Sequence, residues 1–147
     1  MTYKETIHFL FKFSPQYTTT PPNVEIVNNG VTVLPVTEIS DNQEVELHID
    51  FYSDIKDCVL EIVRGNHNGE SPQSLSLVGL EVDGIDLKKV LNHTRFYPQY
   101  PLPWYDEQLA QGIHWPESHQ GWLEWGWNGT WKMSYYTPFY NWLLKEV

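Results

Sequence analysis

Every tryptophan of this 147-residue chain lies in its last third. The seven are Trp104, Trp115, Trp122, Trp125, Trp127, Trp131 and Trp142. An indole ring combines a large apolar face with one N–H donor, so it either joins a core or stacks on a flat ligand such as a sugar ring. This concentration leaves two interpretations open, a tryptophan-rich core and a ligand-binding platform.

Trp125 and Trp127 are the first candidates for stacking on a sugar. Two positions of a strand place both rings on one face, about 7 Å apart. Rings from the preceding segment and polar groups from a turn-rich loop would complete the site. We therefore predict a ligand-binding set formed by Trp125, Trp127, Trp104, Tyr105, Arg64 and Asn66. The alternative is that this aromatic face packs inside the protein, where most large apolar side chains lie.

Glu81, Asp83 and Asp86 surround a predicted turn at Asp83-Gly84. Carboxylates from neighbouring loops are the oxygen ligands that Ca²⁺ takes in proteins, although this spacing matches no EF-hand loop. These three residues are our candidate calcium ligands, and calcium is the one candidate cofactor. The alternative is a solvated acidic turn.

No catalytic pattern accompanies the tryptophans. Hydrolysis of a glycosidic bond needs two carboxylates across a cleft, and Glu117 and Glu124, which lie in the aromatic region, could be nominated as such a pair. The six histidines contain no His-Glu-x-x-His zinc pattern. We therefore predict a protein that is not an enzyme, with a glycoside hydrolase as the alternative.

The formal net charge of −10 restricts the class of partner. Binding to a nucleic acid backbone requires clustered Lys and Arg, and the nine of this chain are scattered. No run approaches the roughly 20 apolar residues that span a bilayer. The N-terminus lacks the pattern of a secretion signal, so we expect cytoplasmic synthesis. Cys58, in an apolar run, is expected to be a buried structural thiol.

Alternating apolar residues predict short strands over most of the first 95 residues. Asn29-Gly30 and Asp83-Gly84 are favourable pairs for tight hairpin turns. A single helical turn is expected at 88–92. The predicted strands cover residues 7–13, 24–27, 31–34, 45–51, 58–63, 75–82 and 85–87. This pattern predicts a mainly β fold, an antiparallel β-sandwich of jelly-roll type, with residues 1–95 as its body.

Residues 96–147 are expected to form an aromatic extension packed on that body, within one domain of residues 1–147. Its Pro-rich part would wrap over the sandwich, with a short helix at 106–111. Asn128-Gly129 predicts a hairpin over 122–135. Thr137-Pro138 predicts the start of a short C-terminal helix that ends at Lys145.

Two segments resemble known proteins. The segment Leu77-Val78-Gly79-Leu80-Glu81-Val82-Asp83-Gly84-Ile85-Asp86-Leu87 resembles calcium-dependent carbohydrate-binding modules of jelly-roll type. The tail, Trp122-Leu123-Glu124-Trp125-Gly126-Trp127 through Phe139-Tyr140-Asn141-Trp142, is similar to small uncharacterised proteins of tailed bacteriophages. The first resemblance implies a sugar-binding sandwich with acidic loops, and the second implies a role in the virion or in infection.

These observations together predict a non-catalytic binding module that recognises a glycan or a protein partner, as an accessory part of a phage virion. One alternative is a structural virion subunit or assembly protein, in which the aromatic segment is core or a subunit interface of a homo-oligomer. The other is an acidic inhibitor that imitates DNA, which requires a row of carboxylates at phosphate-like spacing.

Overall fold

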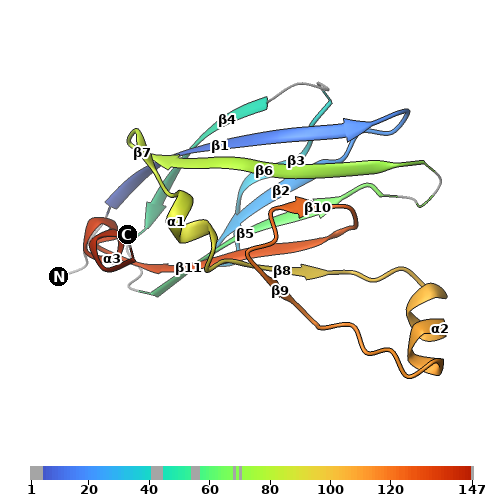
Figure 1. Cartoon of the computed structure of the whole chain (residues 1–147). Coiled ribbons are helices and arrows are strands. Elements are labelled where there is room, and N and C mark those ends of the chain that lie inside the picture. The colour runs from blue at the N-terminus through green and yellow to red at the C-terminus, as the bar shows by residue number, and fades with distance from the viewer. Residues whose placement is uncertain (1–4, 41–44, 54–56, 68, 70, 147) are drawn as a thin grey trace.

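The computed structural model describes residues 5–40, 45–53, 57–67, 69 and 71–146. Over these residues the chain forms two antiparallel sheets that face each other, with three short helices at their edges and ends (Figure 1). The predicted mainly β, antiparallel sandwich is confirmed. Within the described part of the chain, no helix has the length and apolarity that a membrane span requires.

Each sheet combines strands from distant parts of the chain. The first sheet has the order β10-β6-β1-β4, with β7 paired to β6, and comprises β1 (Glu5–Tyr17), β4 (Val45–Ser53), β6 (Gln73–Val82), β7 (Ile85–Asp86) and β10 (Glu124–Trp125). The second has the order β3-β2-β5-β11-β8-β9, and comprises β2 (Asn23–Asn28), β3 (Val31–Glu38), β5 (Asp57–Gly65), β8 (Arg95–Pro98), β9 (His119–Gln120) and β11 (Gly129–Tyr136). The helices are α1 (Lys88–Leu91), α2 (Trp104–Ala110) and α3 (Phe139–Glu146).

The alternating sequence of β1 explains which side of the first sheet faces the core. Ile7, Phe9, Phe11 and Phe13 occupy alternate positions, and all four side chains are buried between the sheets. Because strand side chains alternate between the two faces, this period places every apolar ring of the strand on the core side. The rings also stack along the strand, with the Phe9 and Phe11 centroids 5.8 Å apart. Cys58, on β5, is buried as predicted.

Both predicted hairpin turns are confirmed. Asn29 and Gly30 have φ values of 52° and 78°, and Asp83 and Gly84 have φ values of 49° and 82°. Two successive residues in the left-handed region define the turn that matches the twist of paired strands. These turns join β2 to β3 and β6 to β7.

The predicted hairpin over 122–135 is wrong. β10 pairs with β6 in the first sheet, whereas β11 lies between β5 and β8 in the second. The chain therefore crosses from one sheet to the other at residues 126–128. The Asn128 side chain holds this crossing against the loop after β5. Its Oδ1 accepts the His67 N–H at 2.9 Å, and its Nδ2 donates to the His67 carbonyl at 3.1 Å.

β11 makes the C-terminal residues part of the sandwich body. Trp131, Met133 and Tyr135 of this central strand are buried in the core. The two polar groups among them are satisfied: Trp131 Nε1 donates to Thr94 Oγ1 at 2.9 Å, and Tyr135 Oη donates to Asn28 Oδ1 at 2.8 Å. The expected division at residue 95 is therefore not a structural boundary, since the second sheet needs strands from both sides of it.

α3 covers one end of the sandwich, as the sequence predicts (Figure 1). Its Phe139 and Trp142 side chains are buried. Phe139 lies edge-on to Phe9 of the first sheet at 5.7 Å and to Tyr135 of the second at 5.8 Å. The helix therefore joins both sheets at this end.

The Pro-rich segment differs from the expected wrap. Residues 99–118, which we call the arm, leave the second sheet after β8 and return to it at β9, with α2 at the far tip (Figure 1). α2 spans Trp104–Ala110 and has no buried residue. The arm is nevertheless ordered by its own aromatic contacts, described below, and not by packing on the sandwich.

Candidate ligand-binding site

An aromatic groove lies where the base of the arm faces β10 and the crossing at residues 126–128. Its volume is about 190 Å³. Phe96 and Trp125 form its floor. The aromatic and ionisable residues that line its walls and rim are Tyr100, Trp104, Trp115, His119, Trp122, Glu124 and Trp127. We call this site the aromatic groove.

The floor of the groove is part of the protein core. The Phe96 and Trp125 rings stack with centroids 5.2 Å apart and planes 14° apart. Trp125 is only 1% exposed, and its Nε1 donates to the Trp122 carbonyl at 2.8 Å. This stack therefore fixes the position of the groove relative to both sheets.

The arm contributes one wall. Trp104, near the start of α2, lies 6.1 Å from the Tyr100 ring and 5.5 Å from the Trp115 ring. Trp115 Nε1 donates to Gln108 Oε1 at 3.2 Å, and the Tyr100 hydroxyl donates to the Pro116 carbonyl. The outgoing and returning halves of the arm are thus joined by rings and hydrogen bonds, so the wall is formed before any ligand arrives.

Trp122 and His119 form a stacked pair at the rim. Their ring centroids are 3.9 Å apart and their planes differ by 12°, while 51% of Trp122 remains exposed. His119 Nε2 lies 3.0 Å from Tyr100 Oη, which already donates its proton to Pro116, so the imidazole is the donor in this contact. Burial, and secondarily the positive charge of Arg95, lower the pKa of His119, which favours a neutral ring at neutral pH.

Trp127 also lines the groove and is exposed. It is 41% exposed and lies beside His67, with the ring centroids 5.0 Å apart. Burial, and then the charge of Arg64, lower the pKa of His67. His67 Nδ1 accepts the Gly69 N–H at 3.0 Å, in agreement with a neutral ring.

Glu124 is the one acidic side chain among the described residues that line the groove. It belongs to β10, where it is opposite Ser76, and it is exposed. Within the described part of the chain, its carboxylate has neither a hydrogen bond nor an ion pair. Its oxygens are therefore free to accept hydrogen bonds.

The structure brings together three of the predicted binding residues, Trp104, Trp125 and Trp127, but not as the predicted flat platform. Trp125 is buried as floor, whereas Trp127 stands on the rim. The reason is the crossing between sheets, which ends the strand period after Trp125. Tyr105 stacks on the Tyr100 ring at 5.1 Å and supports the wall without lining the groove.

Arg64 and Asn66 lie outside the groove and have structural contacts. Arg64 is 1% exposed, and its Nη1 donates to Asn128 Oδ1 at 3.1 Å and to the Gly65 carbonyl at 3.2 Å. Burial lowers the pKa of Arg64 to about 10. Asn66 Nδ2 donates to the Pro21 carbonyl at 2.8 Å. Both residues therefore hold the loop after β5.

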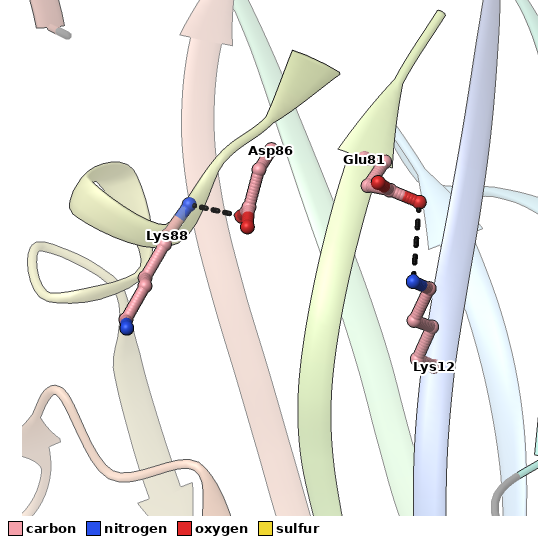
Figure 2. A network of polar contacts seen from close by, with 4 residues as sticks. All are labelled: Lys12, Glu81, Asp86 and Lys88. Carbon is pink, nitrogen blue, oxygen red and sulfur yellow. Dashed lines mark hydrogen bonds and ion pairs between the residues drawn. The ribbon is translucent and has the colours of Figure 1, made fainter. Parts of the chain in front are cut away.

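The three candidate calcium ligands lie around the β6–β7 turn, and each has a partner within the protein. Glu81 forms an ion pair with Lys12 at 3.4 Å, and Asp86 Oδ1 accepts the Lys88 N–H at 2.8 Å (Figure 2). Asp83 accepts a hydrogen bond from the Tyr140 hydroxyl. Among the described residues, no three His, Cys, Asp or Glu side chains are grouped as metal ligands. Calcium binding at this turn stays a prediction.

Sequence reasoning missed Tyr100, Trp115, His119 and Trp122 as site residues, and it considered Glu124 only as a carboxylate for hydrolysis. The pairing of β8 with β9, which places Phe96 opposite His119, brings them together. The alternation of residues within a strand does not predict that β8 pairs with β9, because the arm separates them in the sequence. The available signal was the presence of rings on both sides of the Pro-rich segment. Glu117, the second carboxylate considered for hydrolysis, does not line the groove.

Compared with models of known protein families, with curated proteins and with solved structures, the chain matches none.

Proposed function

We propose that this protein is a non-catalytic binding module that recognises carbohydrate in the aromatic groove. The observation that carries the proposal is the gathering of four accessible tryptophans around one cavity. Trp115, Trp122 and Trp127 are 39%, 51% and 41% exposed, and Trp104 is half-buried. Large exposed apolar surfaces of this kind mark binding sites on proteins.

The chemistry of the groove suits a sugar ring. Indole faces stack on the apolar C–H face of a pyranose. His119, Glu124 and the indole N–H groups of Trp104, Trp122 and Trp127, which have no partner among the described residues, can bond to its hydroxyls. Contacts with neighbouring residues already hold the rings in place. Their side chains therefore lose little conformational entropy when a ligand binds.

The size of the groove favours a small part of a glycan. Its volume of about 190 Å³ lies below the roughly 300–1,000 Å³ of pockets that enclose drug-sized ligands. One or two sugar rings match this space, whereas a dinucleotide cofactor exceeds it.

The acidic lining supports binding without bond cleavage. Glycosidases generally use two carboxyl groups on either side of the scissile bond. Glu124 is the one carboxylate among the described lining residues. A single carboxylate can accept hydrogen bonds from a sugar, but it does not supply both an acid and a base or nucleophile.

Titration calorimetry with a panel of short oligosaccharides built from glucose, mannose, galactose, glucosamine and N-acetylglucosamine tests the proposal. We expect at least one to bind, and Trp122→Ala to weaken that binding by about tenfold, since stacking on one exposed ring contributes on the order of 1 kcal/mol or more. Tyr140→Ala is the matched control, because Tyr140 is an exposed aromatic residue of α3, at the other end of the molecule.

Two results would overturn carbohydrate recognition. One is the absence of binding by every oligosaccharide of the panel. The other is equal affinity of the wild type and Trp122→Ala. If the protein self-associates, and Trp122→Ala or Trp127→Ala abolishes the association, the aromatic groove is instead a subunit interface.

A further inference from the structure

The described residues that line the aromatic groove carry charge of only one sign. Among the described lining residues Glu124 is the one acidic side chain, and none is Lys or Arg. The lowered pKa of His119 keeps the other rim group neutral at neutral pH. At neutral pH the described lining residues therefore carry one negative charge, that of Glu124, and no positive charge.

The rings reinforce this bias. The face of an aromatic ring is the negative end of its quadrupole, and a cation within about 6 Å of an indole face is attracted to it. Trp104, Trp115, Trp122 and Trp127 all line the cavity. A ligand ammonium group in the groove would lie among several indole rings and one acidic residue, Glu124.

Two arginines lie near the groove without lining it, and their charges contribute to the lowered pKa values of His119 and His67. Arg95 directs its Nε to Ser118 Oγ at 2.8 Å, and Arg64 is buried against Asn128. Neither lines the groove. The formal net charge of −10 for the whole chain adds a long-range attraction for cations and repels anionic sugars.

We propose that the aromatic groove selects an amine-bearing sugar, such as a glucosamine unit, whose ammonium group pairs with Glu124 while its C–H face stacks on the tryptophans. This inference rests on the proposed carbohydrate binding and names the class of sugar. Uronic, sialic and sulfated sugars would place a negative charge beside Glu124 and are excluded.

The test compares three oligosaccharides of equal length, made of glucosamine, N-acetylglucosamine and glucose. At about pH 6 a primary amine of this kind is protonated. Calorimetry at low salt should give a dissociation constant on the order of tenfold lower for the glucosamine oligomer than for the other two. Acetylation removes the charge from the same sugar, so this pair isolates the ammonium group.

Glu124→Gln and Glu117→Gln form the matched pair of variants. Each removes one negative charge, and Glu117 is exposed on the arm outside the groove. We expect Glu124→Gln to reduce affinity for the glucosamine oligomer to that of the same variant for the neutral ones, so that the preference for the amine is lost. Glu117→Gln should retain the preference.

The outcomes separate this inference from the proposed function. If the three oligomers bind the wild type equally, or if the preference survives in Glu124→Gln, the inference is overturned while carbohydrate binding stands. If both variants lose the preference equally, net charge and not Glu124 is responsible, and the inference is again overturned. If neither these nor the other oligosaccharides bind, the proposed function fails as well.

Discussion

The Arg64 guanidinium is buried in the protein, and among the described residues it has no carboxylate partner. It is held by the Asn128 side chain and by the Gly65 and Gln73 carbonyls. Its Nε and the Gln73 Oε1 atom are buried without a protein partner. A charged group in this setting costs desolvation, but its removal leaves buried acceptors unsatisfied.

We therefore expect Arg64→Ala to lower the free energy of unfolding by about 3 kcal/mol, because hydrogen bonds from a charged donor are lost and a cavity forms. Lys12→Ala is the comparison, since it breaks the partly exposed contact with Glu81 and should cost less than about 1 kcal/mol. Urea denaturation of both variants measures the difference. Equal losses would contradict the structural role of Arg64.

The lowered pKa of His119 makes the stability of the protein decrease as the pH falls. Its pKa in the folded protein lies below the usual value of 6.5, so the unfolded chain binds the proton more readily. The stability contributed by the neutral ring is complete above the unfolded pKa, and it is lost as the pH falls through the folded pKa.

We expect the wild type to lose more unfolding free energy than His119→Gln when the pH is lowered from about 7.5 to about 5. Urea denaturation at both pH values measures the two losses. His67, whose pKa is also lowered, is present in both proteins, so the comparison isolates His119. A larger loss in the variant would show that the sign is wrong.

At the scale of elements, Gly129 explains the crossing between the sheets. A Cβ at this position would lie 2.5 Å from Phe96 Cζ and 2.5 Å from the Tyr97 carbonyl oxygen. The glycine is therefore needed for close contact between β11 and β8, and its φ is not left-handed as a turn would require. A Cβ at Gly126, just before the crossing, would meet nothing within 4 Å.

Gly129→Ala should therefore destabilise the protein by about 1–3 kcal/mol or more, as overpacking does, because one obstructing atom belongs to the backbone. Gly126→Ala should change stability by less than about 1 kcal/mol. Thermal unfolding of the two variants checks this pair. A similar melting temperature for both would contradict the proposed close packing of β11 on β8.

We expect deletion of the arm to abolish glycan binding while it changes the stability of the protein only slightly. α2 has no buried residue, and the pairing of β8 with β9 closes the base of the arm. Replacing residues 100–117 by Asn-Gly should lower the unfolding free energy by less than about 2 kcal/mol, since exposed insertions contribute little to a core. Glycan affinity should be lost with Trp104 and Trp115. An unfolded deletion variant would contradict this account.

The elements also show what the sequence can predict. The alternation in β1 and the pairs Asn29-Gly30 and Asp83-Gly84 are local signals, and the structure confirms them. Asn128-Gly129 carries the same local signal but does not form a hairpin. There, tertiary contacts with His67 and Phe96 decide the conformation, and no short-range pattern contains them.

At the scale of the whole molecule, the tryptophans divide between the two interpretations that the sequence left open. Trp125, Trp131 and Trp142 are core residues. The other four surround the aromatic groove, with Trp125 beneath them. The sequence predicted three of the groove residues, Trp104, Trp125 and Trp127. It could not predict their arrangement, because the groove depends on the path of the arm and on the sheet that each strand joins.

The central claim is that the four outer tryptophans form a carbohydrate site above Trp125, while the core residues Trp131 and Trp142 take no part in it. Nitrogen–proton correlation NMR of the seven indole N–H groups, assigned by single Trp→Phe variants, tests it in one titration with the oligosaccharide panel. We predict that a binding sugar shifts the signals of Trp104, Trp115, Trp122 and Trp127 and leaves those of Trp131 and Trp142 in place. No shift with any sugar, or shifts confined to Trp131 and Trp142, would contradict the account.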